Sequence, residues 1–547
     1  MRSSTLYVCL NCRLTLRTPS QNAAFSRRVL STASSRPPTA PKPIPNVRHI
    51  RENAELYSQN CIDRNYKPVA DYPPRIQSLA KEASDLQHAL KHPRARIKQV
   101  EKEIAKLATL TARQSQHKQT GKQEETGQDG VTLVEEADNN AALEALRLEA
   151  KELKDASQQI MDRRENCIEE IQQLALSLPN LTSKDTPIGD VPRIVAYINF
   201  DPQSPPSYTS PAAHPSSNLR SHVSIGTELG LIDFSSSATS TGWGWYFLTN
   251  EGCLLEHALV QYALSTAHKK GWKPVSPPSV VYSHIAEACG FQPRDANNEQ
   301  QIWSIQQTER DRAAHKPQRS LTGTAEIPLA AMYASQEIQA GQLPIKLVGA
   351  SRCYRAEAGA RGVDTKGLYR VHEFTKVELF AWADNIECNS TSTVSNEITS
   401  TTVFEEMLSI QTDILSSLNL PCRVLEMSSS DLGASAARKR DIEVLFPSRI
   451  PSDSNNSSVL DPEYSGWGEV TSTSICTDYQ SRRLGTRVRG SGGESRYPHT
   501  VNGTAMAVPR VLAAILEHGW DEKLGGVVIP EVLRPWMGGI EVIAKNK

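Results

Sequence analysis

Two runs of alternating residues, 348–357 and 370–379, carry side chains that could bind a charged ligand. Successive side chains of a strand point to opposite faces. If the runs pair as an antiparallel hairpin, guanidinium groups, carboxylates and an aromatic ring gather on one face above an apolar backing. Fixed guanidinium groups suit phosphates, and a flat ring suits a base. The predicted working face comprises Arg355, Glu357, Arg370, Phe374 and Glu378, together with Cys353, His372 and Lys376.

The connection between the two runs decides how this face is interpreted. A hairpin with one polar face in water is the simpler interpretation of such a pattern. However, the connecting stretch "AGARGVDTKGLY" (358–369) is far longer than a turn requires. Long loops in compact domains are usually functional or disordered. We therefore interpret the hairpin as a binding platform.

The length and charge of the chain limit the classes of function. At 547 residues and 60.3 kDa the chain exceeds one ordinary hydrophobic core, so we expect two or more domains. With 60 basic and 61 acidic residues the net charge is −1, so contact with nucleic acid would require local basic patches. No apolar run approaches the length of a membrane-spanning helix. Ten scattered cysteines support neither a zinc site nor a disulfide framework.

The first fifty residues have the composition of a mitochondrial transit peptide. They contain no Asp or Glu and many Ser and Thr, and "FSRRVLSTASS" suits a processing region. An ordinary disordered tail is the alternative, which the complete absence of acidic residues disfavours. The stretch "RPPTAPKPIPN" is typical of a linker. The arginines of this segment are Arg2, Arg13, Arg17, Arg27, Arg28, Arg36 and Arg48.

Apolar residues spaced alternately three and four apart predict a helical hairpin after the linker. One heptad seam runs through residues 76–107, where Pro93 should kink or split the helix. A second runs through residues 143–178. The polar stretch 114–130 has no periodicity and is predicted to be a loop. Each arm would be about 50 Å long at 1.5 Å per residue, enough to reach beyond a globular body.

The first arm carries a run of basic residues on its predicted outer face. A solvated coiled-coil face is the interpretation that spacing alone favours. Contact with RNA phosphates is the alternative, since it requires charge and reach but no sequence code. The residues concerned are Arg75, Lys81, Lys91, Arg94, Arg96, Lys98 and Lys102.

Mixed strands and helices are expected from about residue 195 to the end. A helix over Leu254–Ala267 leads into a strand whose Pro277 and Pro278 fit only an edge or a junction. Two Ser/Thr/Asn-rich stretches, 386–402 and 452–458, are expected to be surface insertions.

A last helix is predicted near the C-terminus. Apolar residues from Val508 to Leu516 fall at helical spacing, Pro509 suits the first turn, and Gly519 suits the stop. Arg510 falls outside the apolar stripe.

Together these motifs resemble the class II aminoacyl-tRNA synthetases, in particular the seryl-tRNA synthetases of mitochondria. The similarity rests on six stretches in the family's order and on "VRHIRENAEL" before the helical hairpin. It covers nearly everything after residue 46. The six stretches are "TGTAEIPL", "CYRAEAGARGVDTKGLYRVHEFTKVELF", "DLGASAARKRDIEVLFPS", "GEVTSTSICTDYQSRR", "VNGTAMAVPRVLAAILE" and "IPEVLRPWMGG".

The resemblance implies an α+β fold, an antiparallel sheet flanked by helices behind an N-terminal coiled-coil arm. It implies a transit segment and linker (1–45), a tRNA-binding domain (46–190) and a catalytic domain (195–547). Serine, ATP, Mg²⁺ and serine tRNA would be bound, the last through the arm and the loop of the second motif, and the protein would form a homodimer. Matching residues would be Arg355, Glu357, Arg370, Phe374, Glu469, Ser472 and Arg510 for ATP; Thr324, Glu326, Arg355, Glu378 and Thr504 for serine; Glu469 and Ser472 for Mg²⁺; and Arg355 and Arg510 for catalysis.

The chemistry of these residue types agrees with that function. A serine carboxylate is already ionised, so its attack on ATP needs no base but needs positive charge where two anions meet. Glu469 and Ser472 are three residues apart and could share a metal only if a bulge or bend lies between them. A catalytically silent RNA-binding relative is one alternative, disfavoured because the motif residues are complete. An enzyme that charges a carrier protein is another, disfavoured because the helical arm is present.

Overall fold

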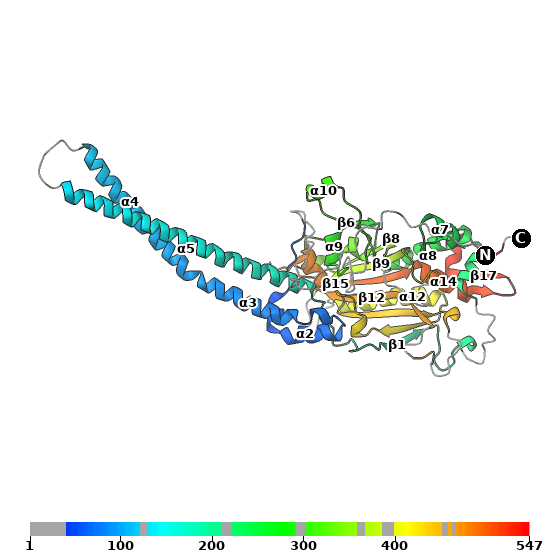
Figure 1. The fold of residues 1–547 in the computed structure, drawn as a ribbon. Coiled ribbons are helices and arrows are strands. Elements are labelled where there is room, and N and C mark those ends of the chain that lie inside the picture. Colours follow the sequence, from blue (N-terminus) through cyan, green and yellow to red (C-terminus); the bar gives the residue numbers. More distant parts are fainter. Residues whose placement is uncertain are drawn as a thin grey trace, which may run out of the picture.

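A long helical arm projects from a body built on a sheet (Figure 1). This computed structural model describes residues 40–120, 129–209, 220–291, 301–357, 367–384, 399–450, 458–461 and 466–545. Residues 1–39 of the predicted transit segment lie outside the described residues. Most of the two predicted insertions lies outside them too, and the end of the first, from Ser400, instead begins a helix.

Three helices form the arm: α3 (Tyr72–Ala89), α4 (Lys91–Thr120) and α5 (Asp129–Ser177). The predicted split near Pro93 is confirmed, because α3 ends at Ala89, four residues before the proline. A proline ring clashes with the carbonyl of the residue four positions earlier. The heptad seam is buried at Ile76, Leu79, Leu90, Val100, Leu143, Ala150, Cys167, Ile171, Leu174 and Leu178.

The predicted limits of the loop over residues 114–130 are wrong, because helix occupies both ends of that stretch. Helix α4 continues to Thr120, and α5 begins at Asp129. Gln, Lys and Arg have good helix propensity, and adding residues to a helix that already exists needs no apolar stripe. With 49 residues, α5 is ~74 Å long, longer than the predicted arm.

Ion pairs join the two sides of the arm and correct part of the predicted basic face. Arg96 Nε lies 2.6 Å from Glu149 Oε1, and Arg75 pairs with Glu170. Both arginines therefore contact α5 rather than pointing outward. Lys91, with other lysines of α4, remains exposed.

The body contains an eight-stranded sheet of order β1-β10-β11-β12-β15-β9-β8-β4, antiparallel except for the β4–β8 pair. Its strands are β1 (Arg193–Ile198), β4 (Lys273–Val275), β8 (Ile345–Tyr354), β9 (Glu373–Ala383), β10 (Cys422–Glu426), β11 (Arg438–Leu445), β12 (Trp467–Thr477) and β15 (His499–Ala507).

Smaller elements surround this sheet. The other strands are β2 (Ile232–Asp233), β3 (Phe247–Leu248), β5 (Val280–Tyr282), β6 (Arg319–Leu321), β7 (Glu337–Gln339), β13 (Arg487–Arg489), β14 (Ser495–Arg496), β16 (Trp520–Asp521), β17 (Gly526–Val528) and β18 (Val542–Ala544). The helices are α6 (His222–Glu228), α7 (Phe234–Ser240), α8 (Asn250–Lys269), α9 (Ser283–Ala288), α10 (Glu309–Ala313), α11 (Glu326–Ala331), α12 (Ser400–Ser417), α13 (Tyr479–Leu484), α14 (Val508–Gly519) and the 3₁₀ turn η8 (Pro447–Arg449).

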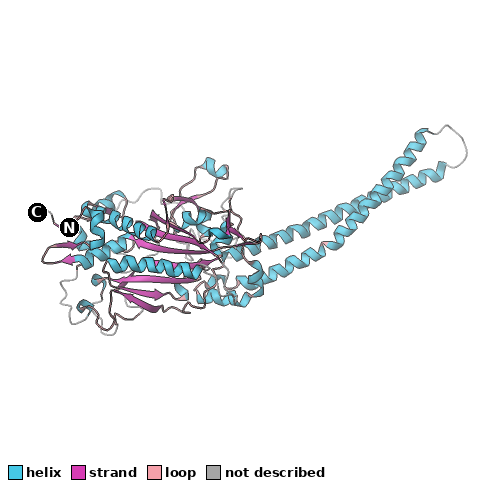
Figure 2. Ribbon diagram, turned by 180° about the vertical axis from the view of Figure 1, so that it is seen from behind, coloured by secondary structure: helices cyan, strands magenta, loops and turns pink. Residues whose placement is uncertain are grey.

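Helices cover the sheet on both faces and leave one part open. The main core joins α8, α12 and α14 to one face, and helices lie across the sheet in Figure 2. On the other face, Phe380 and Trp382 of β9 pack with α9 and α11 in a second core. The stretch of β9 before Phe380 has no such cover and lines a cavity.

The predicted body helices and edge strand are confirmed. Helix α8 extends the predicted helix at both ends, and α14 begins and ends within one residue of its predicted limits. Strand β4 is an edge strand, and Pro277 and Pro278 follow it in the junction before β5. No described helix is both long enough and apolar enough to cross a membrane.

The base of the arm has its own small core, and a buried arginine is among the residues that join it to the body. Helices α1 (Val47–Glu52) and α2 (Ala54–Asp63) pack on α3 and α5. Arg64 has no exposed surface, and Nη1 donates to the carbonyls of Asn180 at 2.6 Å and Ala436 at 2.8 Å. Its Nη2 donates to the Gly433 carbonyl at 2.5 Å. The guanidinium thus ties α2 to the loop before β11.

We predict that Arg64→Met destabilises the protein by about 3 kcal/mol, because three carbonyls, of which that of Ala436 is buried, lose a charged donor. The control is Arg48→Met, since the Arg48 side chain is 86% exposed and pairs only with Glu52 four residues away. That change should stay within ~0.5 kcal/mol. Urea unfolding measures both, and equal effects would contradict the proposed tie.

Candidate active site

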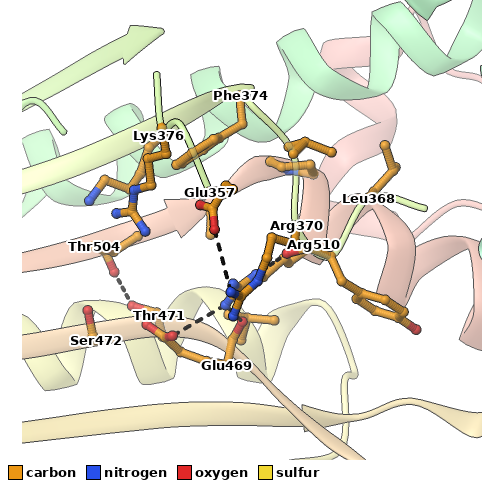
Figure 3. A pocket seen from close by; sticks show the side chains of 16 residues that line it. Glu357, Leu368, Arg370, Phe374, Lys376, Glu469, Thr471, Ser472, Thr504 and Arg510 are labelled. Carbon is orange, nitrogen blue, oxygen red and sulfur yellow. Dashed lines mark hydrogen bonds and ion pairs between the residues drawn. The ribbon is translucent and has the colours of Figure 1, made fainter. Parts of the chain in front are cut away.

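An open cavity of about 570 Å³ lies above strands β9, β12 and β15 (Figure 3). Eight of the eleven predicted site residues line it, although they come from segments up to 155 residues apart in the sequence. These residues are Arg355, Glu357, Arg370, Phe374, Glu469, Ser472, Thr504 and Arg510. The predicted gathering of these groups in one place is therefore confirmed.

The predicted hairpin is present, but its strands are shorter than expected. Strand β8 ends at Tyr354 and β9 begins at Glu373, with Cys353 opposite Phe374. Phe374 and the next alternate residues of β9 share the predicted face. Arg355 and Arg370, in contrast, lie beyond the strand ends, so strand alternation does not place them. Residues 358–366 of the predicted loop lie outside the described residues.

Backbone contacts hold the open end of the hairpin. The Arg355 N–H donates to the His372 carbonyl at 2.9 Å, which continues the pairing beyond β8. The His372 ring contacts the Arg355 carbonyl at 3.0 Å. Glu357 has a left-handed φ of +48°, so the chain turns sharply there. Arg355 is thereby fixed although no strand contains it.

The arginines of the hairpin lie beside an aromatic ring and a carboxylate. The Arg355 guanidinium carbon is 5.3 Å from the centre of the Phe374 ring, and its Nε donates to the Gly323 carbonyl at 3.4 Å. Arg370 pairs with Glu357 at 3.5 Å (Figure 3). Cation and ring together form one wall of the cavity.

A β-bulge brings Glu469 and Ser472 into the same cavity. In the pairing of β11 with β12, Ile442 lies opposite Thr471, but Glu443 lies opposite Glu469, so Val470 is an extra residue. An extra residue changes which side chains share a face. The bend required by the three-residue spacing is therefore present, and both side chains line the cavity.

Arg510 reaches the cavity from the first turn of α14. Its Nε donates to the Tyr369 carbonyl at 2.9 Å, and its Nη1 donates to the Glu469 carbonyl at 2.7 Å. The same nitrogen lies 3.3 Å from Glu469 Oε2 (Figure 3). Pro509 lies in the first turn of α14, where a backbone N–H has no partner within the helix, so proline is tolerated there. Arg510 follows it in the same turn. Arg510 is thus held from two sides.

The charge of Glu469 depends on its neighbours. Burial opposes its ionisation, but the positive charges of Lys439, Arg510 and Arg355 outweigh burial and lower its pKa to about 2. Glu469 is thus a carboxylate at neutral pH. It combines with the Ser472 hydroxyl as an oxygen donor set of the kind that Mg²⁺ takes.

Beneath this wall lies a buried pair of opposite charges. Glu378 is 1% exposed, and its Oε2 lies 2.6 Å from Lys376 Nζ. The Thr504 hydroxyl donates to the same oxygen at 3.4 Å. Burial raises the pKa of Glu378, while Lys376 opposes this rise. Glu378 itself lies below the cavity lining, at the floor formed by Thr504 and Lys376.

Thr324 and Glu326 lie beside this floor but do not line the cavity. Glu326 accepts from Gln480 at 2.6 Å and from Asn502 at 3.1 Å. Burial, followed by the nearby charge of Glu378, raises the pKa of Glu326 to about 8. The Thr324 hydroxyl accepts the Glu326 N–H at 3.4 Å. These two residues form a buried polar cluster next to Glu378.

Two further residues of the cavity had no predicted role. Lys376 was predicted to lie on the working face but was given no role there. Its alternation with Phe374 and Glu378 was the signal that could have assigned it to the site. Thr471 donates from its hydroxyl to the Thr504 carbonyl, which joins β12 to β15. No local pattern marks that contact. The described residues contain no group of three or more His, Cys, Asp or Glu that could hold a metal ion.

Comparison with known proteins agrees with this geometry. A family model described as the core domain of class II tRNA synthetases (G, H, P, S and T) matches residues 309–519. The mitochondrial serine–tRNA ligase of Saccharomyces cerevisiae is 39% identical over 91% of this chain and 93% of its own. The chain belongs to the serine–tRNA ligase family. Relatives from Schizosaccharomyces pombe (mitochondrial) and Rubrobacter xylanophilus are 34% and 35% identical over 93% and 90% of this chain, and over 91% and 97% of their own.

Solved structures confirm the fold expected of a class II synthetase. The crystal structure of seryl-tRNA synthetase from Pyrococcus horikoshii complexed with ATP superposes with a TM-score of 0.66 at 26% identity, covering 92% of this chain and all of that one. The cytoplasmic enzyme of Naegleria fowleri, in complex with AMP, shares the fold with a TM-score of 0.65 at 22% identity, covering 92% and 99%.

We predict that Lys376→Met destabilises the protein by roughly 3–5 kcal/mol at neutral pH, because it leaves the Glu378 charge buried and unpaired. The loss should shrink as the pH falls, since a protonated Glu378 needs no counter-charge. The double variant Lys376→Met with Glu378→Gln should regain much of the stability in urea unfolding. Simple addition of the two single losses would show that the pair is not coupled.

Proposed function

We propose that the protein activates L-serine with ATP, forming seryl-adenylate and pyrophosphate, and then transfers serine to the 3′-terminal ribose of serine tRNA. Family membership supports this activity, and one structural observation supports the assignment of residues. Arg355 and Arg510, from two distant motifs, face one cavity together with Glu469 and lie above the buried carboxyl groups of Glu326 and Glu378. That arrangement suits a nucleotide with its phosphates at the arginines and an amino acid with its ammonium group at the carboxylates.

The nucleotide would bind at the upper wall. Phe374 offers a flat ring to the adenine base, and Arg370 and Glu357 lie at the edge of the same wall. Arg355 would contact the α-phosphate and the serine carboxylate, and Arg510 the γ-phosphate. Because the attacking carboxylate is already ionised, these fixed positive charges perform the main task, which is to stabilise two anions as they meet.

Glu469 and Ser472 would hold Mg²⁺. The fit rests on a carboxylate that stays ionised and on the bulge that places the Ser472 hydroxyl in the same cavity. When bound, Mg²⁺ would supply further positive charge to the ATP phosphates.

Serine would bind below the nucleotide, beside the buried carboxyl groups of Glu326 and Glu378. Thr324 and Glu326 would take the ammonium group, and Glu378 with Thr504 the side-chain hydroxyl. Glu378 is buried, and an alanine substrate would deprive it of the donor that the serine hydroxyl would supply. A site built on a substrate hydroxyl can discriminate by roughly 10⁴-fold.

Pyrophosphate exchange tests the activity directly. A protein lacking residues 1–45 should catalyse exchange that depends on serine, and alanine should not replace serine. Arg510→Ala should lower the rate at least ~100-fold by removing a transition-state charge, whereas Arg534→Ala, outside the cavity, should not. A folded, ATP-binding protein without serine-dependent exchange would favour a silent RNA-binding relative.

The pH dependence of serine binding tests the role of Glu326. Since its pKa is raised to about 8, Glu326 is protonated at lower pH. It must then lose that proton before it can pair with the ammonium group of serine. The KM for serine should therefore rise as pH falls below 8, by at most ~tenfold per pH unit. Glu326→Gln should have a high KM with a flat profile. An unchanged pH profile in that variant would assign the ionisation to another group.

We further propose that residues 46–190 bind serine tRNA through the arm, whereas residues 195–547 form the catalytic domain. Lys91, Lys98 and Lys102 are separated by seven and four residues, so they share one face of α4 and are exposed. Val100, half a turn around the helix, is buried. A row of lysines on an arm of this length suits phosphates distant from the cavity.

Charge reversal on this row separates the two steps of the reaction. The variant Lys91→Glu, Lys98→Glu and Lys102→Glu should lower kcat/KM for tRNA charging at least ~tenfold and reduce its salt dependence. Adenylate formation should be unchanged, because the lysines lie outside the cavity. Equal loss of both activities would contradict separate roles for arm and body.

Localisation and assembly are also proposed. The arginine-rich, acid-free first fifty residues, and the mitochondrial relatives at 39% and 34% identity, support import into the mitochondrial matrix. A homodimer is supported by the edge strand β4 and by Val280 and Tyr282 just after it, which are 42% and 40% exposed.

A further inference from the structure

A carboxylate outside the cavity, that of Glu517, collects hydrogen bonds from three segments. Its side chain has no exposed surface. Oε1 accepts from His222 N at 3.1 Å, His222 Nδ1 at 2.8 Å, the Tyr369 hydroxyl at 3.1 Å and the Ser448 hydroxyl at 2.9 Å. Oε2 accepts from Ser448 N at 3.1 Å. Glu517 thus joins α14 to α6, to η8 and to the segment that returns from the hairpin loop.

The hydrogen bonds define the protonation of His222. Although burial opposes ionisation, the hydrogen bonds from His222 and Ser448 lower the pKa of Glu517, so its oxygens act as acceptors. His222 Nδ1 must therefore carry a proton. The Leu368 N–H donates to His222 Nε2 at 3.0 Å, so that nitrogen must be bare. His222 is a neutral imidazole that connects a carboxylate to a backbone N–H.

The segment held by His222 forms part of the cavity. Leu368, Tyr369 and Arg370 all line it. A Cβ atom added to Gly367, whose φ is +64°, would lie 2.2 Å from His222 Nε2, so the backbone is closely fitted to the imidazole. The Tyr369 ring packs edge-on against the His222 ring, with centroids 4.6 Å apart. His222 therefore constrains where the cavity wall lies.

This segment also orients an arginine of the site. The Tyr369 carbonyl accepts from Arg510 Nε at 2.9 Å, while Glu469 contacts the other end of the same guanidinium. A shift of Tyr369 would leave Arg510 tied to Glu469 alone. A small displacement of a positive charge that faces a developing anion reduces the stabilisation that the charge gives to that anion.

We propose that His222 and Glu517 are positioning residues for ATP: they hold residues 367–370 so that the Tyr369 carbonyl directs Arg510 at the phosphates. This inference rests on the proposed role of Arg510 in binding ATP. Neither residue lines the cavity, and both act through the backbone between them and the arginine.

Two substitutions of His222 separate positioning from packing. The amide nitrogen of Asn can occupy the place of Nδ1, so His222→Asn keeps a donor for Glu517 but cannot reach the Leu368 N–H. The amide oxygen of Gln can occupy the place of Nε2, so His222→Gln keeps the acceptor for Leu368. We expect His222→Asn to weaken ATP binding and to raise the KM for ATP in serine-dependent exchange about tenfold, and His222→Gln to stay within about threefold of wild type. The KM for serine should not change in either variant.

Ser448→Ala is the matched control, because it removes a donor to Glu517 beside the Tyr369 hydroxyl and leaves the His222–Leu368 hydrogen bond in place. It should lower the unfolding temperature but leave the KM for ATP unchanged. Direct titration with ATP separates the two proposals, since a wild-type protein that binds no ATP would reject the proposed function itself. The inference is wrong if wild type binds ATP and all three variants bind it equally well. It is also wrong if both His222 variants lose the same ATP affinity and the same Tm, because His222 would then act only in packing.

Discussion

The contact between Arg510 and Glu469 joins helix α14 to strand β12 at the centre of the cavity, and the arrangement of the site depends on it. The guanidinium donates to both the carbonyl and the carboxylate of Glu469. Each charge compensates the other at the wall of the cavity. A nucleotide with its metal would offer each group a stronger partner, phosphate for Arg510 and a cation for Glu469.

A second charge pattern runs from the upper wall to the floor. Arg355 lies near the top, and two buried carboxyl groups, Glu326 and Glu378, lie below it. A zwitterionic amino acid would be oriented by this polarity, its carboxylate toward Arg355 and its ammonium group toward Glu326. Burial, followed by the charge of Glu378, raises the pKa of Glu326, so an ionised Glu326 is unfavourable there without a cation. A ligand that places a positive charge beside it would relieve this cost.

Sequence patterns predicted the elements better than the connections between them. The heptad seams, the edge strand before Pro277 and the helix that carries Arg510 could all be read from periodicity and proline position. The extent of α4 and α5 could not, since their polar ends are helical through propensity without an apolar stripe. Arg75 and Arg96 were placed on the wrong side because their partners lie on another helix. The contact of His222 with Glu517 spans 295 residues and has no local signature.

The eleven site residues came from a family resemblance together with strand alternation, and only part of their geometry followed from the latter. Alternation explains Phe374 and Glu378, whereas the bulge at Val470 explains why Glu469 and Ser472 can meet. The most direct test is a crystal structure with a non-hydrolysable seryl-adenylate analogue. The amino group should lie at Glu326, the sulfamate that replaces the phosphate at Arg355, and the adenine on Phe374. An analogue bound in the reverse direction, or outside the cavity between β9 and α14, would contradict the proposed site.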